Sequence, residues 1–193
     1  MQKDSVLKIF KKIPTIETDR LFLRRLKISD YADMYEYSRL DSVTKYLLWN
    51  SHPDARYTRD YLAYIQSQYR AGEFYDWAIV HKETNKMIGT CGFARLDFDN
   101  NSAEIGYVLN PEFWRMGYAT EAVKKIIDIG FHTLNLHRIE ARYIVGNEVS
   151  RHVMEKCGMT FEGVHKSSLF VKDSYVNVGY CAITADEYIS NYL

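Results

Sequence analysis

The stretch that decides the fold is "FWRMGYATEAVKKIIDIGF", residues 113–131. Apolar side chains recur every three or four positions from Ala119 to Phe131, which predicts an amphipathic helix. A bend with Arg115 and Gly117 comes before this helix. Glycine tolerates the backbone angles of a tight bend and has no Cβ, so a ligand can approach the main chain there. Because free amides and the dipole at a helix start attract anions, the bend is a candidate phosphate loop.

This bend also fits an ordinary loop. A single glycine before a helix is more often structural than functional, and the short stretch alone does not choose between the two interpretations. Arg115 adds an argument for phosphate, since a guanidinium group makes charge-assisted hydrogen bonds with phosphate oxygens. The residues on either side of the loop must therefore decide.

Strands and helices are mixed along the chain. Alternating apolar residues predict strands at 18–26, 75–82, 86–96, 102–109, 137–145, 160–171 and 174–183. Helical spacing predicts helices at 29–40, 58–71, 119–131 and 147–158. Ser29 and Asn147 are the expected N-caps, and Gly158 is the expected left-handed stop after the last helix. This order predicts a mixed α/β (α+β) domain with a mainly antiparallel sheet.

The composition is that of one ordinary globular domain. Of the 193 residues, 47% are hydrophobic and 26% are charged, which is enough to bury a sizeable core. The 25 basic and 25 acidic side chains cancel, so no general nucleic-acid or membrane surface is expected. Residues 1–17 are expected to be an N-terminal extension, and residues 18–193 a single domain.

The cysteines and histidines indicate neither a metal site nor a nucleophile. Three cysteines lie far apart in the sequence, which predicts free thiols in a reducing, cytoplasmic compartment. Of these, Cys157 is expected in the core. His137, His152 and His165 have no metal-ligand spacing and are expected to be structural or exposed.

Two longer stretches change the interpretation of the loop. "AEIGYVLNPEFWRMGYATEAV" (residues 103–123) and "RIEARYIVGNEVSRHVMEKCGMTFEGV" (residues 138–164) resemble the GNAT superfamily of N-acetyltransferases. More narrowly, they resemble its RimJ/RimL branch, which acetylates the N-termini of ribosomal proteins. The superfamily's loop has Gln or Arg, two residues, Gly, one residue, then Gly or Ala. Trp114, Gly117 and Ala119 hold these positions, and tryptophan matches the branch.

The resemblance implies a GNAT fold that binds acetyl-CoA as co-substrate, with no metal. Its sheet of about seven strands is flanked by helices and splayed between the strands of Tyr107 and Ala141, where the thioester lies. The pyrophosphate would be held by the backbone amides of Arg115, Met116, Gly117, Tyr118, Ala119 and Thr120. Tyr107, Val108 and Leu109 would offer backbone hydrogen bonds to the pantetheine arm and the acetyl carbonyl. Arg115 stands where the branch often has glycine, so two roles stay open: phosphate ligand or solvated side chain.

The resemblance also suggests which groups move protons. Glu104 is the candidate base, acting directly or through water, with a solvated strand carboxylate as the alternative. Asn147 and Ser150 are three residues apart at a helix start, so they face the same way. Asn147 fits an N-cap in any protein and, by resemblance, a contact to pantetheine. Ser150 would donate a hydrogen bond to the departing sulfur.

The implied reaction is direct attack of a primary amine on acetyl-CoA in a ternary complex. The branch points to a protein N-terminus as the acceptor. Small amines (polyamines, amino acids or aminoglycosides) are the alternative, and a catalytically silent acyl-CoA sensor is a third possibility. Trp49, Asn50 and Tyr75 fall where the family approaches its acceptor. Relatives are monomers or homodimers, and the sequence favours neither.

Overall fold

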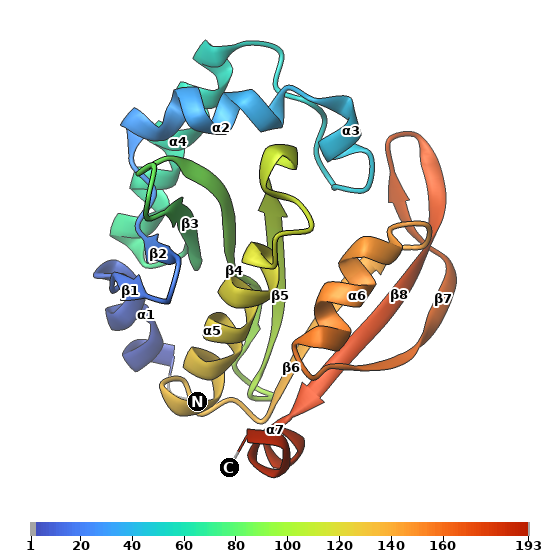
Figure 1. Ribbon diagram of the computed structural model, residues 1–193. Helices are drawn as coiled ribbons and strands as arrows, with labels where there is room; N and C mark the ends of the chain where they lie inside the picture. Colours follow the sequence, from blue (N-terminus) through green and yellow to red (C-terminus); the bar gives the residue numbers. More distant parts are fainter. Residues whose placement is uncertain (1–2, 193) are drawn as a thin grey trace.

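The computed structural model describes residues 3–192, so residues 1, 2 and 193 of the expected extension and domain lie outside it. One sheet runs through the molecule in the order β1-β2-β3-β4-β5-β6-β8-β7 (Figure 1). Its strands are β1 (Ile16–Glu17), β2 (Leu21–Arg24), β3 (Asp76–His81), β4 (Met87–Asp97), β5 (Ser102–Leu109), β6 (Arg138–Ile144), β7 (Thr160–Val171) and β8 (Ser174–Thr184).

The mainly antiparallel sheet is confirmed, with eight strands in place of about seven. The extra strand is β1, which has two residues and pairs with β2. Every neighbouring pair is antiparallel except β5 and β6. A parallel pair needs a crossover connection, and here helix α5 provides it.

The helices are α1 (Lys3–Lys11), α2 (Tyr31–Ser38), α3 (Asp41–Thr44), α4 (Ala55–Ala71), α5 (Tyr118–His132), α6 (Glu148–Lys156) and α7 (Ala185–Tyr192), with 3-10 turns η1 (Ile28–Asp30) and η2 (Pro111–Phe113). The sequence analysis did not predict α1, α3 or α7. Within residues 3–192, no helix is long and apolar enough to span a membrane.

The predicted helix ends are partly right. Asn147 caps α6, where its side chain accepts a hydrogen bond from the Ser150 amide, and Gly158 has a φ of +87° after α6. Ser29 is wrong as a cap. It lies inside η1, and the N-cap of α2 is Asp30. The Asp30 carboxylate accepts a hydrogen bond from the Lys27 amide at 2.8 Å, so it fixes the turn before the helix.

Helix α4 begins at Ala55, three residues before the predicted start at Thr58. Asp54 is the cause, because its side chain accepts a hydrogen bond from the Tyr57 amide at 2.7 Å. An aspartate in this position satisfies an amide that has no partner within the helix.

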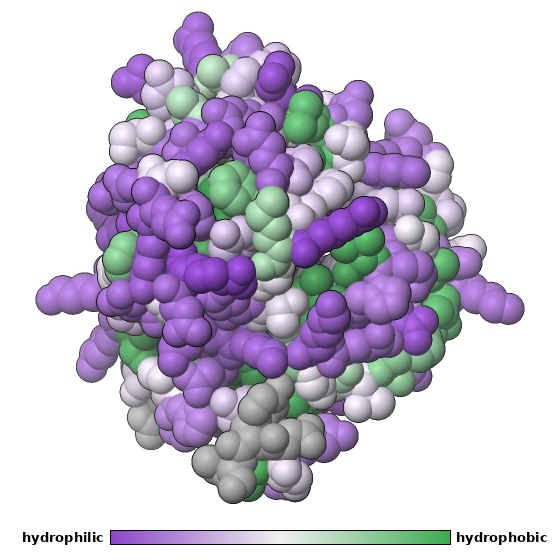
Figure 2. All heavy atoms as spheres, in the orientation of Figure 1, coloured by the Kyte–Doolittle hydropathy of each residue, from purple (hydrophilic) through white to green (hydrophobic). Residues whose placement is uncertain are grey.

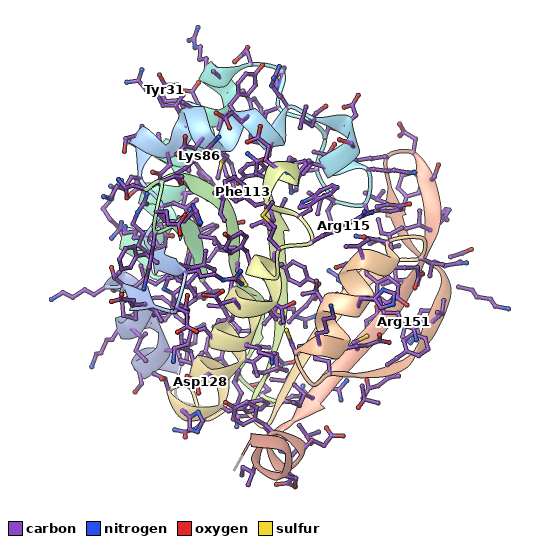
Figure 3. All side chains as sticks on the ribbon, viewed as in Figure 1. Tyr31, Lys86, Phe113, Arg115, Asp128 and Arg151 are labelled. Carbon is purple, nitrogen blue, oxygen red and sulfur yellow. The ribbon has the colours of Figure 1, made fainter. Side chains whose placement is uncertain are left out.

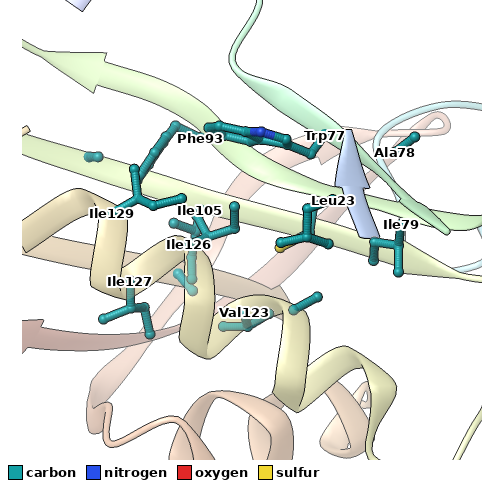
Figure 4. Packing of buried hydrophobic residues seen from close by; sticks show 14 of the residues in the cluster. Leu23, Trp77, Ala78, Ile79, Phe93, Ile105, Val123, Ile126, Ile127 and Ile129 are labelled. Atoms are coloured by element: carbon teal, nitrogen blue, oxygen red, sulfur yellow. The ribbon is translucent and has the colours of Figure 1, made fainter. Parts of the chain in front are cut away.

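The core includes α2 and α4, and the part that positions the loop lies between the sheet and α5. Val123, Ile126 and Ile127 of α5 pack against Leu23, Ile79 and Ile105 of three strands (Figure 4). Helix α1 adds Val6 and Phe10, and the Phe10 ring meets the Trp77 ring edge-on at 5.5 Å. This packing fixes the start of α5, and with it the loop that precedes α5.

Strands β5 and β6 separate after a short shared segment. They pair only at residues 102–104 and 138–140, and beyond that point β5 stays with β4 while β6 stays with β8. The sheet therefore opens into a V, visible in Figure 1 between β5 and β6. The predicted splay is confirmed.

Candidate active site

The loop before α5 presents a row of amides. Gly117 is the N-cap of α5 with a φ of +84°, and Arg115 has a φ of +62°. Inside the described part of the chain, the backbone amides of residues 115–120 donate no hydrogen bond, and the first amide of the helix that does so belongs to Glu121. Free amides at the positive end of a helix dipole bind anions. The loop thus presents the free amides that an anion site requires.

Side chains from distant segments hold this loop in place. Arg20 Nη1 donates a hydrogen bond to the Met116 carbonyl at 2.8 Å, and Arg20 also forms an ion pair with Glu121 at 2.7 Å. Thr18 Oγ1 donates to the same carboxylate at 2.6 Å. Burial opposes ionisation of Glu121, but these hydrogen bonds prevail and lower the pKa of its carboxyl. The sequence analysis missed this brace because its residues lie about a hundred positions apart.

The edge of β5 faces into the V. The Val108 carbonyl lies against Gly89 of β4, so it points away from the V. Successive residues of a strand alternate in direction, and the backbone groups of Tyr107 and Leu109 therefore point toward the gap. The Leu109 carbonyl already accepts a hydrogen bond from Trp114 Nε1 at 2.7 Å. The backbone groups of Tyr107 thus face the gap beyond Glu104, the last residue of β5 that pairs with β6.

Two predicted residues from separate elements meet at the V. The Tyr107 hydroxyl donates a hydrogen bond to the Ser150 carbonyl at 2.8 Å and lies 2.8 Å from Ser150 Oγ. Burial raises the pKa of Tyr107, so the phenol stays protonated. Asn147 caps the same turn, with its side-chain oxygen 3.4 Å from the Ser150 amide. The Ser150 hydroxyl is therefore held in one position.

Apolar side chains line the mouth of the V on the side of α5 and α6. Met116 and Val149 are both more than half exposed there. Figure 2 shows apolar atoms gathered in the gap between the start of α5 and α6, on a face that is otherwise mostly hydrophilic. Arg115 lies in the same gap (Figure 3). The combination of an apolar groove and a cationic end suits a long thiol ester with a charged tail.

Glu104 lies at the apex of the V, opposite Glu140 in the last residue pair shared by β5 and β6. Its carboxylate forms an ion pair with Arg142 at 2.6 Å, and its side chain is 13% exposed. It faces away from α5, because its neighbours Ala103 and Ile105 are the residues of this strand that are buried under the helix. Glu104 and the loop amides thus lie on opposite faces of the sheet.

A second cleft lies at the open end of the V. We call residues 41–51 the roof segment. The Thr44 carbonyl accepts a hydrogen bond from Lys172 of the β7–β8 turn at 2.6 Å, and Gly146 lies against the Tyr46 ring. The cleft is lined by Asp41, Ser42, Thr44, Lys45, Asn50, Ser51 and Lys172. Of the three predicted acceptor residues only Asn50 lines it.

The other two predicted acceptor residues lie elsewhere. The Trp49 ring lies 5.2 Å from the His52 ring. Tyr75 packs on Phe10 at 4.7 Å, which places it against the core. These aromatic contacts are sufficient to explain both side chains.

The remaining candidates have structural surroundings. Cys157 is buried as predicted, and burial raises the pKa of its thiol to about 12. The His165 ring stacks on Tyr180 at 4.4 Å, and His152 bonds the Glu148 carbonyl of its own helix. His137 donates its backbone amide to Asn101. Across residues 3–192 no three His, Cys, Asp or Glu side chains gather as a metal site would need.

Comparisons with known proteins agree with this geometry. The family model of the acetyltransferase (GNAT) domain matches residues 20–160. The uncharacterized N-acetyltransferase p20 of Bacillus licheniformis is 35% identical over 90% of this chain and 98% of its own. A crystal structure of a GNAT-family acetyltransferase from Bacillus anthracis superposes with a TM-score of 0.80 and 28% identity, covering 90% of this chain and 99% of that one.

One solved neighbour contains the ligand that the loop suggests. The ribosomal-protein alpha-N-acetyltransferase RimL, solved in complex with coenzyme A, shares the fold with a TM-score of 0.77 at 20% identity. It covers 90% of this chain and 99% of its own length. With its split sheet, its amide-lined loop and these relatives, the chain belongs to the GNAT family of acetyltransferases and is an N-acetyltransferase.

Proposed function

We infer that the chain transfers the acetyl group of acetyl-CoA to the α-amino group of a protein N-terminus, by direct attack in a ternary complex. The observation that carries this proposal is the parting of β5 and β6 immediately after Glu104. The gap has loop amides and Ser150 on one face and charged side chains on the other. A slot open on both faces lets donor and acceptor meet without a covalent enzyme intermediate.

The loop fits the donor's pyrophosphate. The free amides of residues 115–120 supply hydrogen bonds, and Gly117 adopts the φ of +84° that this bend requires. The Arg20–Glu121 ion pair keeps the loop in this shape before anything binds. Preorganisation of this kind lowers the entropy cost of binding.

The groups around the gap fit the transfer step. Acetyl-CoA supplies a thioester carbon open to attack and a thiolate as leaving group. Backbone groups of Tyr107 face the gap, where an amide donor would stabilise the developing oxyanion. The Ser150 hydroxyl, held by Tyr107, would hydrogen-bond the sulfur more strongly as negative charge grows on it. Glu104, the base candidate from the sequence, lies at the apex of the gap with one of its oxygens engaged by Arg142.

The charge of the acceptor side supports a peptide over a polyamine. The cleft beside the roof segment contains Lys45 and Lys172 as well as Asp41, so its lining has positive and negative charges. A polyamine site would gain from carboxylates alone, since lysines repel a polycation. A peptide N-terminus offers an ammonium group together with carbonyls that lysines can bind. RimL, an alpha-N-protein acetyltransferase that shares the fold, is consistent with this choice.

The test is release of free coenzyme A thiol from acetyl-CoA across an amine panel. The panel contains peptides with a free N-terminus, the same peptides with a blocked N-terminus, spermidine and an aminoglycoside. We expect turnover with free N-termini and none with the blocked peptides. Preference for spermidine would select the small-amine alternative, and coenzyme A binding without turnover on any amine would select the sensor.

A further inference from the structure

A second carboxylate lies on the face of the sheet that is turned away from α5. Asp76 is the first residue of β3. Its neighbour Trp77 is packed under the α5 side of the sheet, so the Asp76 side chain points to the opposite face. That is the face on which Glu104 lies. The sequence analysis did not single out Asp76.

Asp76 is separated from the V by two glycines of neighbouring strands. It pairs with Gly92 of β4, and Gly92 in turn pairs with Gly106 of β5. The Asp76 carboxylate leans over Gly92 so closely that a Cβ there would collide with its Oδ1. Two glycines thus form the floor between Asp76 and the gap. Neighbouring strands lie about 4.8 Å apart, so the span from Asp76 to Gly106 is roughly 10 Å, enough for an amino group and one water.

The surroundings of Asp76 leave its carboxylate uncompensated. The titratable groups that interact with it electrostatically are the hydroxyls of Tyr37 from α2 and of Tyr61 and Tyr69 from α4, and the Cys91 thiol of β4 from the other face of the sheet. Tyr69 donates its hydrogen bond to the backbone carbonyl of Asp76 at 2.6 Å, not to the carboxylate. Burial raises the pKa of Asp76 to about 7, and within residues 3–192 no cation or hydrogen bond offsets that burial.

Glu104 differs from Asp76 in this respect. Arg142 Nε donates a hydrogen bond to Glu104 Oε1 at 2.6 Å, so this carboxylate already has a cationic partner. Asp76 is half-buried, side by side with tyrosine rings and without a cation. An ammonium group above the Gly92–Gly106 floor would find in Asp76 a carboxylate with no competing partner.

We propose that Asp76 binds the acceptor amine over the Gly92–Gly106 floor and takes up its proton before attack. This role rests on the proposed N-acetyltransferase function and names the residue that prepares its acceptor.

Every proton in the proposed reaction has a donor and an acceptor among the groups named here. Asp76 takes one proton from the ammonium group, directly or through one water, and the neutral nitrogen attacks the thioester carbon. The carbon–nitrogen bond forms and the carbon–sulfur bond breaks. The second proton of the nitrogen reaches the departing sulfur, next to the Ser150 hydroxyl. Asp76 releases its proton to solvent when the product leaves. No oxidant, metal or other reactant is required.

The experiment compares Asp76→Asn, Asp76→Glu and Glu104→Gln by steady-state kinetics between pH 6 and pH 9, with a free N-terminal peptide. Asp60→Asn is the matched control, because it is the same aspartate-to-asparagine change at an exposed position of α4. Acetyl-CoA binding, measured by calorimetry, reports that each variant is folded.

For Asp76→Asn we expect kcat to fall about 100-fold or more at pH 7, with acetyl-CoA affinity within about twofold of wild type. The defect shrinks at pH 9, because an α-amino group with a pKa of about 8 is then neutral without help. Asp76→Glu recovers part of the rate. In Glu104→Gln the acid limb of the profile keeps its position.

Two results would overturn the proposal. If Asp76→Asn keeps wild-type turnover, or loses the same factor at every pH, Asp76 does not take the proton. If the acid limb disappears in Glu104→Gln but not in Asp76→Asn, Glu104 is the base. A wild-type chain that acetylates no amine at all would instead refute the proposed function itself, and the two failures are therefore distinguishable.

Discussion

The hydroxyl of Tyr107 lies 2.8 Å from the hydroxyl of Ser150, and a further hydrogen bond joins it to the Ser150 carbonyl. One side chain of β5 thus fixes both the main chain and the side chain of the first turn of α6. The bond joins β5 to α6, the helix that follows β6. It therefore connects the two arms of the V at a point where β5 and β6 are no longer paired.

For Ser150→Ala we expect kcat to fall by roughly 10- to 150-fold, since one hydrogen bond to the charged sulfur contributes roughly 1.5–3 kcal/mol. Acetyl-CoA affinity changes little, because the sulfur carries no charge before reaction. Tyr107→Phe gives a smaller loss of kcat, because the serine stays present but turns freely. Steady-state kinetics with calorimetric binding separate these effects. Unchanged turnover in Ser150→Ala would remove the serine from the mechanism.

Gly117→Val is expected to weaken coenzyme A binding by at least 10-fold while folding is affected much less. A β-branched residue is strained at the φ of +84° seen here, and its Cβ would lie 3.3 Å from Nη2 of Arg20, the side chain that holds the loop. Calorimetry measures affinity, and thermal unfolding measures stability. Gly163→Val is a matched control, since Gly163 also has a positive φ but lies in β7. Equal losses of affinity and stability in Gly117→Val would mean a merely structural bend.

Arg115→Gly tests whether the loop binds through its backbone. Arg115 has a φ of +62°, which glycine adopts without strain, so the loop shape is retained. We expect coenzyme A affinity to fall by less than about threefold, and this loss should be the same at low and high ionic strength. A loss of more than 10-fold that fades at high ionic strength would instead assign the guanidinium to a phosphate.

Asp76→Asn is expected to alter the pH dependence of stability. Burial raises the pKa of Asp76 from its usual value to about 7, so the folded state holds a proton that the unfolded state loses near pH 4. Wild-type stability from this group is present at low pH and is lost as pH rises through 7. The gain from Asn therefore grows between pH 4 and pH 7, to between about 1 and 4 kcal/mol. Urea unfolding at several pH values measures it, and a gain independent of pH would contradict the raised pKa.

The sequence predicted the elements whose signal is local. Residues 113–131 contain the loop glycine and the apolar stripe of α5, so both were found. Helix α3 spans only four residues, too short for its spacing to show a period. Helix α1 has apolar residues at helical spacing, but its lysines are typical of a charged N-terminal tail. Only the folded structure shows that Phe10 packs on Trp77. Ser29 was the wrong cap because it lies inside the turn η1, and Asp30 at the end of that turn is the N-cap of α2.

The site was predictable where a motif marks it and unpredictable where only folding brings residues together. Ser150 and Tyr107 belong to recognisable stretches, although their mutual hydrogen bond joins residues 43 positions apart. Arg20 reaches the loop from β2, with no local pattern to mark it. For Asp76 the sequence did contain a signal. The aspartate directly precedes the apolar residues 77–80 of β3, and a carboxylate at the start of a buried strand is a candidate functional residue.

The V has a consequence for the stability of the free protein. After Glu104 the facing edges of β5 and β6 lack the ladder of hydrogen bonds that a continuous sheet would have. A ligand that fills the gap and contacts both edges can supply hydrogen bonds in place of the missing ladder. Such a ligand stabilises the folded protein as an added strand would. Coenzyme A at 100 times its Kd would raise the free energy of unfolding by about 2.7 kcal/mol. The chain is therefore most stable when it is loaded and ready to react.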